Sequence, residues 1–209
     1  MLSANVILAI LEVIKGRKIE EAAIKNFTTK NRVLEAVRDL NSRGLLSRNE
    51  EIKASVHQRI QLIYLALKRG ASVKEVSKTV GWRDFEEITS RLFEENGYSV
   101  RSHVILSNRR EIDVLARKKN DFMAVDCKHW TREIYPSVLE RIVKMQLERI
   151  QTLVNELNIK ANVYPLIVVL QRPRQMMWRG VPVIPISYLN DFLLNFEALK
   201  RKIVVFSKF

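Results

Sequence analysis

Two apolar runs in the second half of the sequence are interrupted by acidic residues and a lysine. Asp113 stands within "EIDVLAR" (111–117), and Asp126 and Lys128 stand within "FMAVDCKHW" (122–130). Because side chains alternate along a strand, Asp126 and Lys128 are expected to point to the same face of a sheet. Charged groups in apolar strands cost free energy unless they are paired or bound to a metal ion. These residues are therefore the first candidates for a functional site.

A carboxylate on one strand and an acid-x-Lys on the next strand suit metal-dependent hydrolysis of a phosphodiester. Two or three carboxylate oxygens hold a hard cation such as Mg²⁺, which polarises the phosphoryl oxygen and activates a water. The lysine orients or deprotonates that water, or neutralises the pentavalent phosphate. The alternative for Asp113 and Lys128 is a buried structural ion pair.

Alternating helix and strand patterns position these residues. A helix begins at Asp84 and ends at Gly97, and a polar turn at 107–109 separates the first two strands. The expected strands are Tyr98–Leu106, Glu111–Arg117, Phe122–Trp130 and Val163–Leu170, with a long helix from Pro136 to about Leu157 before the last of them. A further strand and helix follow in "VPVIPISYLNDFLLNF" (181–196), and "KIVVF" (202–206) is expected to be the last strand. This order predicts an α/β fold with one parallel crossover.

The second half resembles the PD-(D/E)xK nuclease superfamily, and within it the Mrr-type restriction endonucleases and the archaeal Holliday-junction resolvases. The matching stretches are "FEEITSRLFEENGYSV" (85–100), "REIDVLA" (110–116) and "VDCKHW" (125–130). The resemblance extends from Trp82 to Leu170, with weaker support as far as Leu194. It implies a restriction-endonuclease-like mixed sheet flanked by helices.

The resemblance also implies a role for each matching residue. Asp113 would be the first metal ligand, Asp126 the second ligand and Lys128 the catalytic lysine. Glu86 falls where the family has its first-helix acid, which supports the metal directly or through a water. The metal would be Mg²⁺, with Mn²⁺ as a substitute, and Gln146 on the long helix would support the site. The sequence departs from the family in one respect, because Asp126 stands where Glu or Gln is more frequent.

Several of these residues also have structural alternatives. Glu86 and Glu87 stand in the first turn of a helix, where acidic side chains stabilise the helix dipole. His129 is expected on the strand face opposite Lys128, which favours a structural role. Cys127 is typical of a small core residue.

The loop "QRPRQMMWRG" (171–180) is the candidate for contacts with substrate. If the strands 122–130 and 163–170 are parallel, this loop emerges beside Lys128. Arg172 and Arg174, with Arg179, would then hold phosphates, and Trp178 would stack on a base or wedge a base step. An ordinary solvated loop is the alternative.

The first half has the pattern of short helices followed by a hairpin. Helices are expected near residues 3–16, 19–25 and 29–42, and a polar turn at 48–51 divides two short strands. With "LNSRGLLSRNEEIK" (40–53), this order resembles a winged helix-turn-helix. By that resemblance the third helix enters the major groove, and its contact residues would be Lys30, Asn31, Arg32 and Arg38. A dimerisation or protein-contact module is the alternative. A further helix opens at Ser55, with Ile60, Ile63, Tyr64 and Leu67 expected to face inward.

The composition indicates a soluble, basic, globular protein. The 209 residues are 47% hydrophobic and 28% charged, with a net charge of +13. Residues 1–81 carry +7 (15 basic against 8 acidic residues) and residues 82–209 carry +6 (21 against 15), with the domain boundary expected at Gly81-Trp82. A single Cys excludes a disulfide framework, and Glu12 inside the first apolar run argues against a signal peptide. A cytoplasmic location is expected, with nucleic acid rather than a membrane as the partner.

Together these patterns predict a Mg²⁺-dependent deoxyribonuclease, with residues 82–209 as the nuclease domain. Residues 1–81 would be a winged-helix-like domain that positions duplex or branched DNA. Two chains related by a twofold axis would cut two strands most simply, so a homodimer is expected. The first alternative is a non-catalytic DNA-binding or regulatory protein on a nuclease fold. The second is a nuclease directed at RNA, although no RNA-recognition signature is visible.

Overall fold

The chain divides into two compact units. The computed structural model describes residues 2–48, 52–130, 135–156, 161–170 and 172–207. Contacts separate Met1–Asp84 from Phe85–Phe209. The boundary expected at Gly81-Trp82 falls at the start of helix α6 (Trp82–Glu95), which begins in the first unit and continues into the second.

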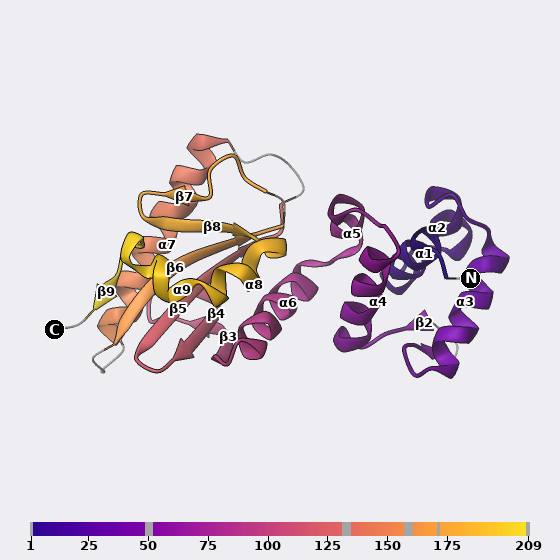
Figure 1. The fold of residues 1–209 in the computed structure, drawn as a ribbon, viewed down its shortest axis with the longest axis horizontal. Coiled ribbons are helices and arrows are strands. Elements are labelled where there is room, and N and C mark those ends of the chain that lie inside the picture. Colours follow the sequence, from indigo (N-terminus) through magenta and orange to yellow (C-terminus); the bar gives the residue numbers. More distant parts are fainter. Residues whose placement is uncertain (1, 49–51, 131–134, 157–160, 171, 208–209) are drawn as a thin grey trace. The chain divides into compact units, whose positions relative to one another are not determined.

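The N-terminal unit is mainly helical, with one short hairpin. Its elements are α1 (Ala4–Ile14), α2 (Ile19–Lys25), α3 (Lys30–Ser42), β1 (Ser47–Arg48), β2 (Ile52–Lys53), α4 (Val56–Lys68) and α5 (Val73–Thr79) (Figure 1). Helix α1 is the centre of this unit, because it contacts α2, α3, α4 and α5 and is buried from residue 6 to residue 12. Strands β1 and β2 pair antiparallel, and residues 49–51 of the predicted turn lie outside the described residues.

Helix α3 has one buried face and one polar face, as its pattern predicts. Thr29 caps it by accepting a hydrogen bond from the backbone N–H of Arg32, and Val33, Val37 and Leu40 are buried. The side chains proposed to contact DNA are all exposed: Lys30, Asn31, Arg32 and Arg38. The winged-helix resemblance itself stays a prediction.

The inward face of α4 differs from the predicted one. Leu62, Ile63 and Ala66 are buried, whereas Tyr64 is 62% exposed and lies beneath the Lys68 ammonium, 5.1 Å from the ring centre. The helix begins where expected, with a capping box between Ser55 and Gln58. Tyr64 fits the apolar periodicity of α4 but lies at the edge of its apolar face. The side chains that pack inward, toward α1, are those of Leu62, Ile63 and Ala66.

The C-terminal unit is an α/β domain built on a mixed sheet. After α6 its elements are β3 (Ser99–Ile105), β4 (Glu111–Lys118), β5 (Asp121–Lys128), α7 (Pro136–Glu156), β6 (Asn162–Val169), β7 (Met177–Trp178), β8 (Val181–Pro185), α8 (Ile186–Leu194), α9 (Phe196–Leu199), η1 (Lys200–Lys202) and β9 (Phe206–Ser207). In the described part of the chain the sheet has seven strands in the order β3-β4-β5-β6-β8-β7, and β9 pairs with β6. Strands β5, β6 and β8 are parallel, while β3, β4 and β5 form an antiparallel meander. This architecture confirms the predicted restriction-endonuclease-like mixed sheet flanked by helices.

Helices cover both faces of this sheet. Helix α7 lies behind it and α8 and α9 lie in front in Figure 1. On the α7 face, Phe122 and Ala124 of β5 pack in one cluster with Ile150 and Leu153. On the other face, Tyr164 of β6 packs edge-on against Phe196 of α9. Strands β5 and β6 therefore lie between two apolar layers. Charged side chains at the ends of these strands are unusual in such surroundings.

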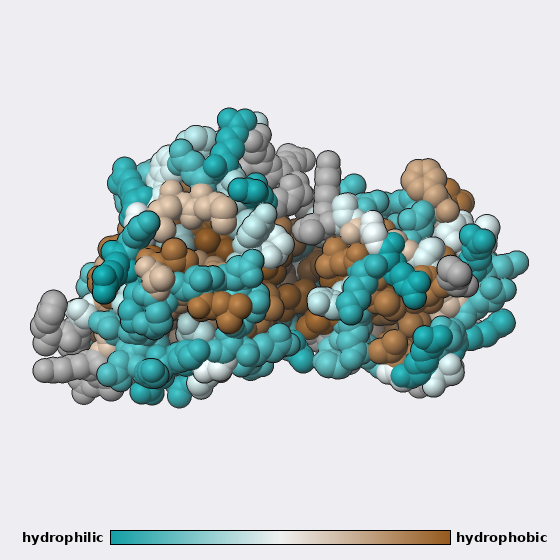
Figure 2. All heavy atoms as spheres, viewed as in Figure 1, coloured by the Kyte–Doolittle hydropathy of each residue, from teal (hydrophilic) through white to brown (hydrophobic). Residues whose placement is uncertain are grey.

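Two local predictions near the C-terminus were incomplete. Met177–Trp178 forms a short strand, β7, within a stretch predicted to be a loop. In the predicted strand 202–206, Lys202 ends a 3₁₀ helix and pairing begins only at Phe206. No helix in the described ranges is long and apolar enough to cross a membrane. Hydrophilic side chains cover most of the visible surface of each unit, with apolar atoms between them (Figure 2).

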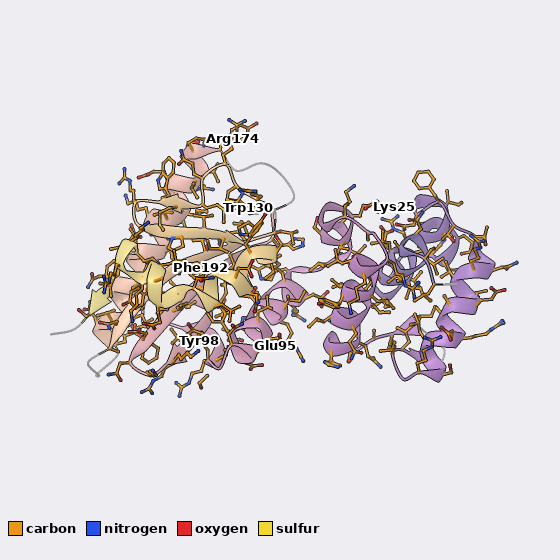
Figure 3. The ribbon with its side chains drawn as sticks, viewed as in Figure 1. Lys25, Glu95, Tyr98, Trp130, Arg174 and Phe192 are labelled. Carbon is orange, nitrogen blue, oxygen red and sulfur yellow. The ribbon has the colours of Figure 1, made fainter. Side chains whose placement is uncertain are left out.

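The buried carboxylate of Glu12 is predicted to stabilise the N-terminal unit. It forms an ion pair with Arg17, with 2.8 Å between Nε and Oε2, and its Oε1 accepts a hydrogen bond from Lys25 Nζ at 2.6 Å (Figure 3 labels Lys25). Replacement Glu12→Ala should lower the free energy of unfolding by about 2 kcal/mol, because a charge-assisted hydrogen bond and an ion pair are lost. Urea denaturation of the full chain, followed by circular dichroism, measures this change. The matched control Glu21→Ala should cost less than about 0.5 kcal/mol, since that side chain is exposed. Equal effects of the two replacements would contradict the stabilising role of Glu12.

Candidate active site

The two aspartates meet where strands β4 and β5 stop pairing. Val114 and Val125 are the last register partners at this end of the β4–β5 ladder, and Asp113 and Asp126 are the next residues on each strand. The Asp113 carboxylate accepts the backbone N–H of Cys127 through Oδ2 at 2.6 Å, in place of a backbone partner on β4. The structure thus brings together the two acids that the sequence separates by thirteen positions.

Asp126 is the most enclosed charge of the site. Its side chain is 2% exposed, and its Oδ1 accepts from both Lys128 Nζ at 2.8 Å and Arg149 Nη1 at 2.7 Å. Its second oxygen, Oδ2, is buried and has no hydrogen-bond partner among the described residues. Two cations neutralise one oxygen of this carboxylate, and the other oxygen keeps its lone pairs available for a ligand.

Gln146 positions this arrangement from helix α7. It is fully buried, its Nε2 donates to the carbonyl oxygen of Ala124 at 2.7 Å, and its Oε1 accepts from Arg149 Nη1 at 3.3 Å. The amide therefore fastens α7 to β5 and orients Arg149 toward Asp126. Gln146 therefore lies next to Arg149, and its support of the site stays a prediction.

The pKa of Asp113 is raised to about 6. Burial is the main cause, and the nearby negative charge of Asp126 adds to it. The Cys127 N–H and the Lys128 ammonium oppose this shift. Such a perturbed carboxyl beside a second carboxylate is a common property of catalytic and metal sites.

Glu86 reaches the site from α6 and is 4% exposed. Its Oε2 lies 3.8 Å from Nε2 of His103 on β3, and Nδ1 of the same imidazole lies 2.6 Å from Glu111 Oε1. The hydrogen bond to Glu111 raises the pKa of His103, and the charges of Glu86 and Asp113 act in the same direction. The negative charge of Glu86 also contributes to the raised pKa of Asp113.

His103 interrupts the β3–β4 ladder opposite Asp113. The pairs Ser102–Val114 and Val104–Ile112 are in register on either side, which leaves His103 as the residue across from Asp113. Its φ of 56° lies in the left-handed region, which His adopts more readily than most residues. The change of backbone direction turns this imidazole toward Glu86 and Glu111.

The carboxylates suit a hard divalent cation. Mg²⁺ and Mn²⁺ prefer oxygen ligands of the kind offered by Asp113, Asp126 and Glu86. The buried Oδ2 of Asp126 accepts no hydrogen bond from the described residues, so its lone pairs could bind an ion. As the side chains stand, no group of three or more His, Cys, Asp or Glu residues in the described part of the chain encloses an ion. Occupation by a metal would therefore draw the carboxylates together.

The remaining residues near the site have structural surroundings. His129 packs edge-on against Phe85, with ring centres 5.9 Å apart, on the face away from Lys128. Cys127 is buried, and burial raises the pKa of its thiol. Glu87 pairs with Arg91 one turn along α6. These placements agree with the structural alternatives for His129, Cys127 and Glu87.

The loop after β6 begins beside the site. Strands β5 and β6 are parallel, and Lys128 is in register with Val169 at their shared end. Arg174 is exposed and points away from the sheet (Figure 3), and Arg172 lies over the Tyr188 ring at 5.5 Å. The Trp178 indole is half-buried, donating to Glu140 Oε2 at 2.6 Å. That indole therefore packs within the domain, and its contact with a base stays a prediction.

Sequence reasoning did not assign roles to Arg149 and His103. Arg149 lies three residues after Gln146 on an amphipathic helix, so the sequence pattern indicates that it points inward. The pattern does not indicate that its partner is Asp126, 23 positions earlier in the chain. His103 could have been found from the turn centred near Asn108, because a hairpin with that centre pairs position 103 with position 113.

Residues 77–154 match the family of the Mrr catalytic domain, a restriction endonuclease, and this segment contains every candidate residue from Glu86 to Arg149. The predicted resemblance to Mrr-type nucleases is confirmed. Among solved structures, the chain resembles a protein of unknown function, AF1548, with 17% identity, a TM-score of 0.38 and coverage of 55% of this chain and 66% of that one. It also resembles protein VC1899 from Vibrio cholerae, with 13% identity, a TM-score of 0.42 and coverage of 95% and 52%. At these TM-scores neither likeness bears on fold or function. No match was found among curated proteins.

The raised pKa of Asp113 predicts how the metal-free protein responds to pH. The folded protein binds a proton at Asp113 more tightly than the unfolded chain does, so its stability falls as the pH rises from about 4 to about 6. Asp113→Asn keeps an oxygen for the Cys127 N–H and removes the charge. This variant should match the wild type below about pH 4 and exceed it by up to about 3 kcal/mol above about pH 6.

Denaturation curves in EDTA across this pH range measure the difference. The control Asp191→Asn removes an exposed carboxylate of α8 and should leave the pH dependence unchanged. A constant difference between Asp113→Asn and wild type at all pH values would contradict the assigned shift.

Proposed function

We propose that this chain, whose residues 77–154 belong to the Mrr-type restriction endonuclease family, is a divalent-metal-dependent DNA endonuclease. The observation that carries the proposal is the Asp126 carboxylate. It gives one oxygen to Lys128 and Arg149 and keeps the other available, next to Asp113. A structural ion pair would need neither the second cation nor an unsatisfied buried oxygen.

Asp113, Asp126 and Glu86 would hold the ion. A bound Mg²⁺ or Mn²⁺ supplies Lewis-acid polarisation of the phosphoryl group and lowers the pKa of water. Lys128, 16% exposed, is close enough to Asp126 to be held at the site and open enough to reach a substrate phosphate. Its ammonium would stabilise the negative charge that develops on the phosphoryl oxygens.

Arg149 would keep the site in order before metal and DNA arrive. It neutralises Asp126 from the side of α7, and Gln146 fixes its direction. Because Arg149 also pairs with Asp126, the Lys128 ammonium could move to a substrate phosphate while the buried carboxylate of Asp126 stays neutralised. We assign Arg149 and Gln146 as positioning residues.

We further propose that the N-terminal unit, residues 1–84, positions the DNA through the exposed side of α3. Arg32 and Arg38 offer positive charge there, and Lys30 is 51% exposed beside Glu20. In the C-terminal unit, Arg172 and Arg174 would hold phosphates near the end of β6. A homodimer would bring two sites to the two strands of a duplex.

A non-catalytic DNA-binding protein is the second candidate. It is favoured by the ion pairs that Asp126 forms with Lys128 and Arg149 and by the lack of a ready three-ligand group among the described residues. Binding of DNA without cleavage under every metal condition would establish this candidate.

Removal of the Lys128 ammonium should slow cleavage strongly and spare binding. The full chain is incubated with duplex, single-stranded, flapped and four-way-junction DNA in Mg²⁺, Mn²⁺ or EDTA. Lys128→Ala should lower the cleavage rate about 10²- to 10⁴-fold, because stabilisation of the transition state is lost. The matched control Lys202→Ala removes an exposed lysine of η1 and should cleave normally. Cleavage that persists in EDTA, or that proceeds at the wild-type rate in Lys128→Ala, would contradict the mechanism.

The α3 surface should account for part of the salt dependence of DNA binding. The double variant Arg32→Ala/Arg38→Ala should reduce the slope of log affinity against log salt concentration by about two, one for each lost phosphate contact. Lys68→Ala/Arg69→Ala removes the same charge from the end of α4 and should change the slope less. Fluorescence anisotropy with labelled duplex measures both slopes. Equal slopes for the two double variants would make α3 an ordinary charged surface.

A further inference from the structure

Glu111 holds the imidazole of His103 in one orientation beside the carboxylates. A carboxylate accepts hydrogen bonds only, so the proton of this 2.6 Å contact belongs to Nδ1 of His103. In the neutral imidazole the lone pair is then on Nε2, the atom that lies 3.8 Å from Glu86 Oε2. A histidine whose Nδ1–H is fixed by a carboxylate is the usual arrangement for a metal ligand through Nε2.

The spacing also suits a shared ion. Two ligand atoms that each lie about 2.1 Å from one metal ion are about 3 to 4 Å apart. The Nε2–Oε2 distance falls within that range. His103 is also the residue opposite Asp113 in the β3–β4 register, and the charge of Asp113 acts on the imidazole.

Packing alone does not explain His103. Its side chain is 59% exposed, so it contributes little to the core. Its left-handed backbone interrupts the ladder at this residue, which costs free energy that an extended residue would not lose. An unfavourable backbone conformation next to a functional site is typical of a residue that has a role in that site.

We propose that His103 is a nitrogen ligand of the divalent metal ion held by Asp113 and Glu86, with Glu111 orienting it. The inference rests on the proposed metal-dependent function and adds a consequence that oxygen ligands do not have. A nitrogen ligand favours Mn²⁺ or Co²⁺ over the harder Mg²⁺. Mn²⁺ should therefore bind more tightly than Mg²⁺, and loss of the imidazole should narrow that difference.

Electron spin-echo spectroscopy of bound Mn²⁺ tests the assignment directly, because it detects nitrogen bound to the ion. The full-length wild type, with Mn²⁺ at about pH 8, above the ordinary pKa of imidazole, should show nitrogen modulation. That modulation should change when the protein carries ¹⁵N-labelled histidine, a comparison that needs no variant. His103→Asn, which tolerates the left-handed backbone, should lose the modulation and bind Mn²⁺ about 10-fold more weakly.

Control variants separate His103 from the other histidines and from its orienting partner. His57→Gln and His129→Gln should keep the nitrogen modulation. Glu111→Gln should keep it too, while weakening Mn²⁺ binding about 10-fold. Mn²⁺ binding that shows no nitrogen modulation, or modulation unchanged in His103→Asn, would overturn the inference. Mn²⁺ binding that is insensitive to Asp113→Asn would instead overturn the proposed function.

Discussion

The site depends on one buried carboxylate that is shared by two cations. Asp126 lies at the end of β5, where apolar layers cover the strand on both faces. An isolated carboxylate there would be strongly disfavoured, and the pairing with Lys128 and Arg149 is what permits it. The geometry of α7 follows from this need, since Arg149 must reach β5 and Gln146 must hold it there. The charge of the site therefore also fixes how the helix is seated on the sheet.

The two aspartates show how neighbouring charges acquire different properties. Asp126 is neutralised by cations, whereas Asp113 accepts a hydrogen bond from a backbone N–H and has a neighbouring negative charge. Burial and that charge raise the pKa of Asp113 to about 6. The metal-free fold thus carries an electrostatic cost at Asp113 that a divalent cation would relieve. A cation that binds the folded protein and relieves this cost would also raise the free energy of unfolding.

Much of the domain and of its site could be predicted from the sequence. Alternation along β5 placed Asp126 and Lys128 on one face, and the helix and turn signals located α6, α7 and the meander. The contact between Arg149 and Asp126 could not be predicted, because it depends on how α7 is seated across the parallel crossover. The exposure of Tyr64 was missed because an amphipathic ring fits either side of a helix boundary. The hydrogen bond from the Trp178 indole to Glu140 could not be predicted either, because it depends on the packing of β7 against α7.

The left-handed residue in β3 has a consequence for the solubility of the protein. In the described part of the chain β3 is the outermost strand of the sheet, and such strands present a row of unpaired N–H and C=O groups to other chains. The turn of the backbone at His103 breaks that row near its middle. An intruding strand would find no continuous template there, so polymerisation through this edge is discouraged. The residue that we propose as a metal ligand would thereby also protect the open side of the sheet from aggregation.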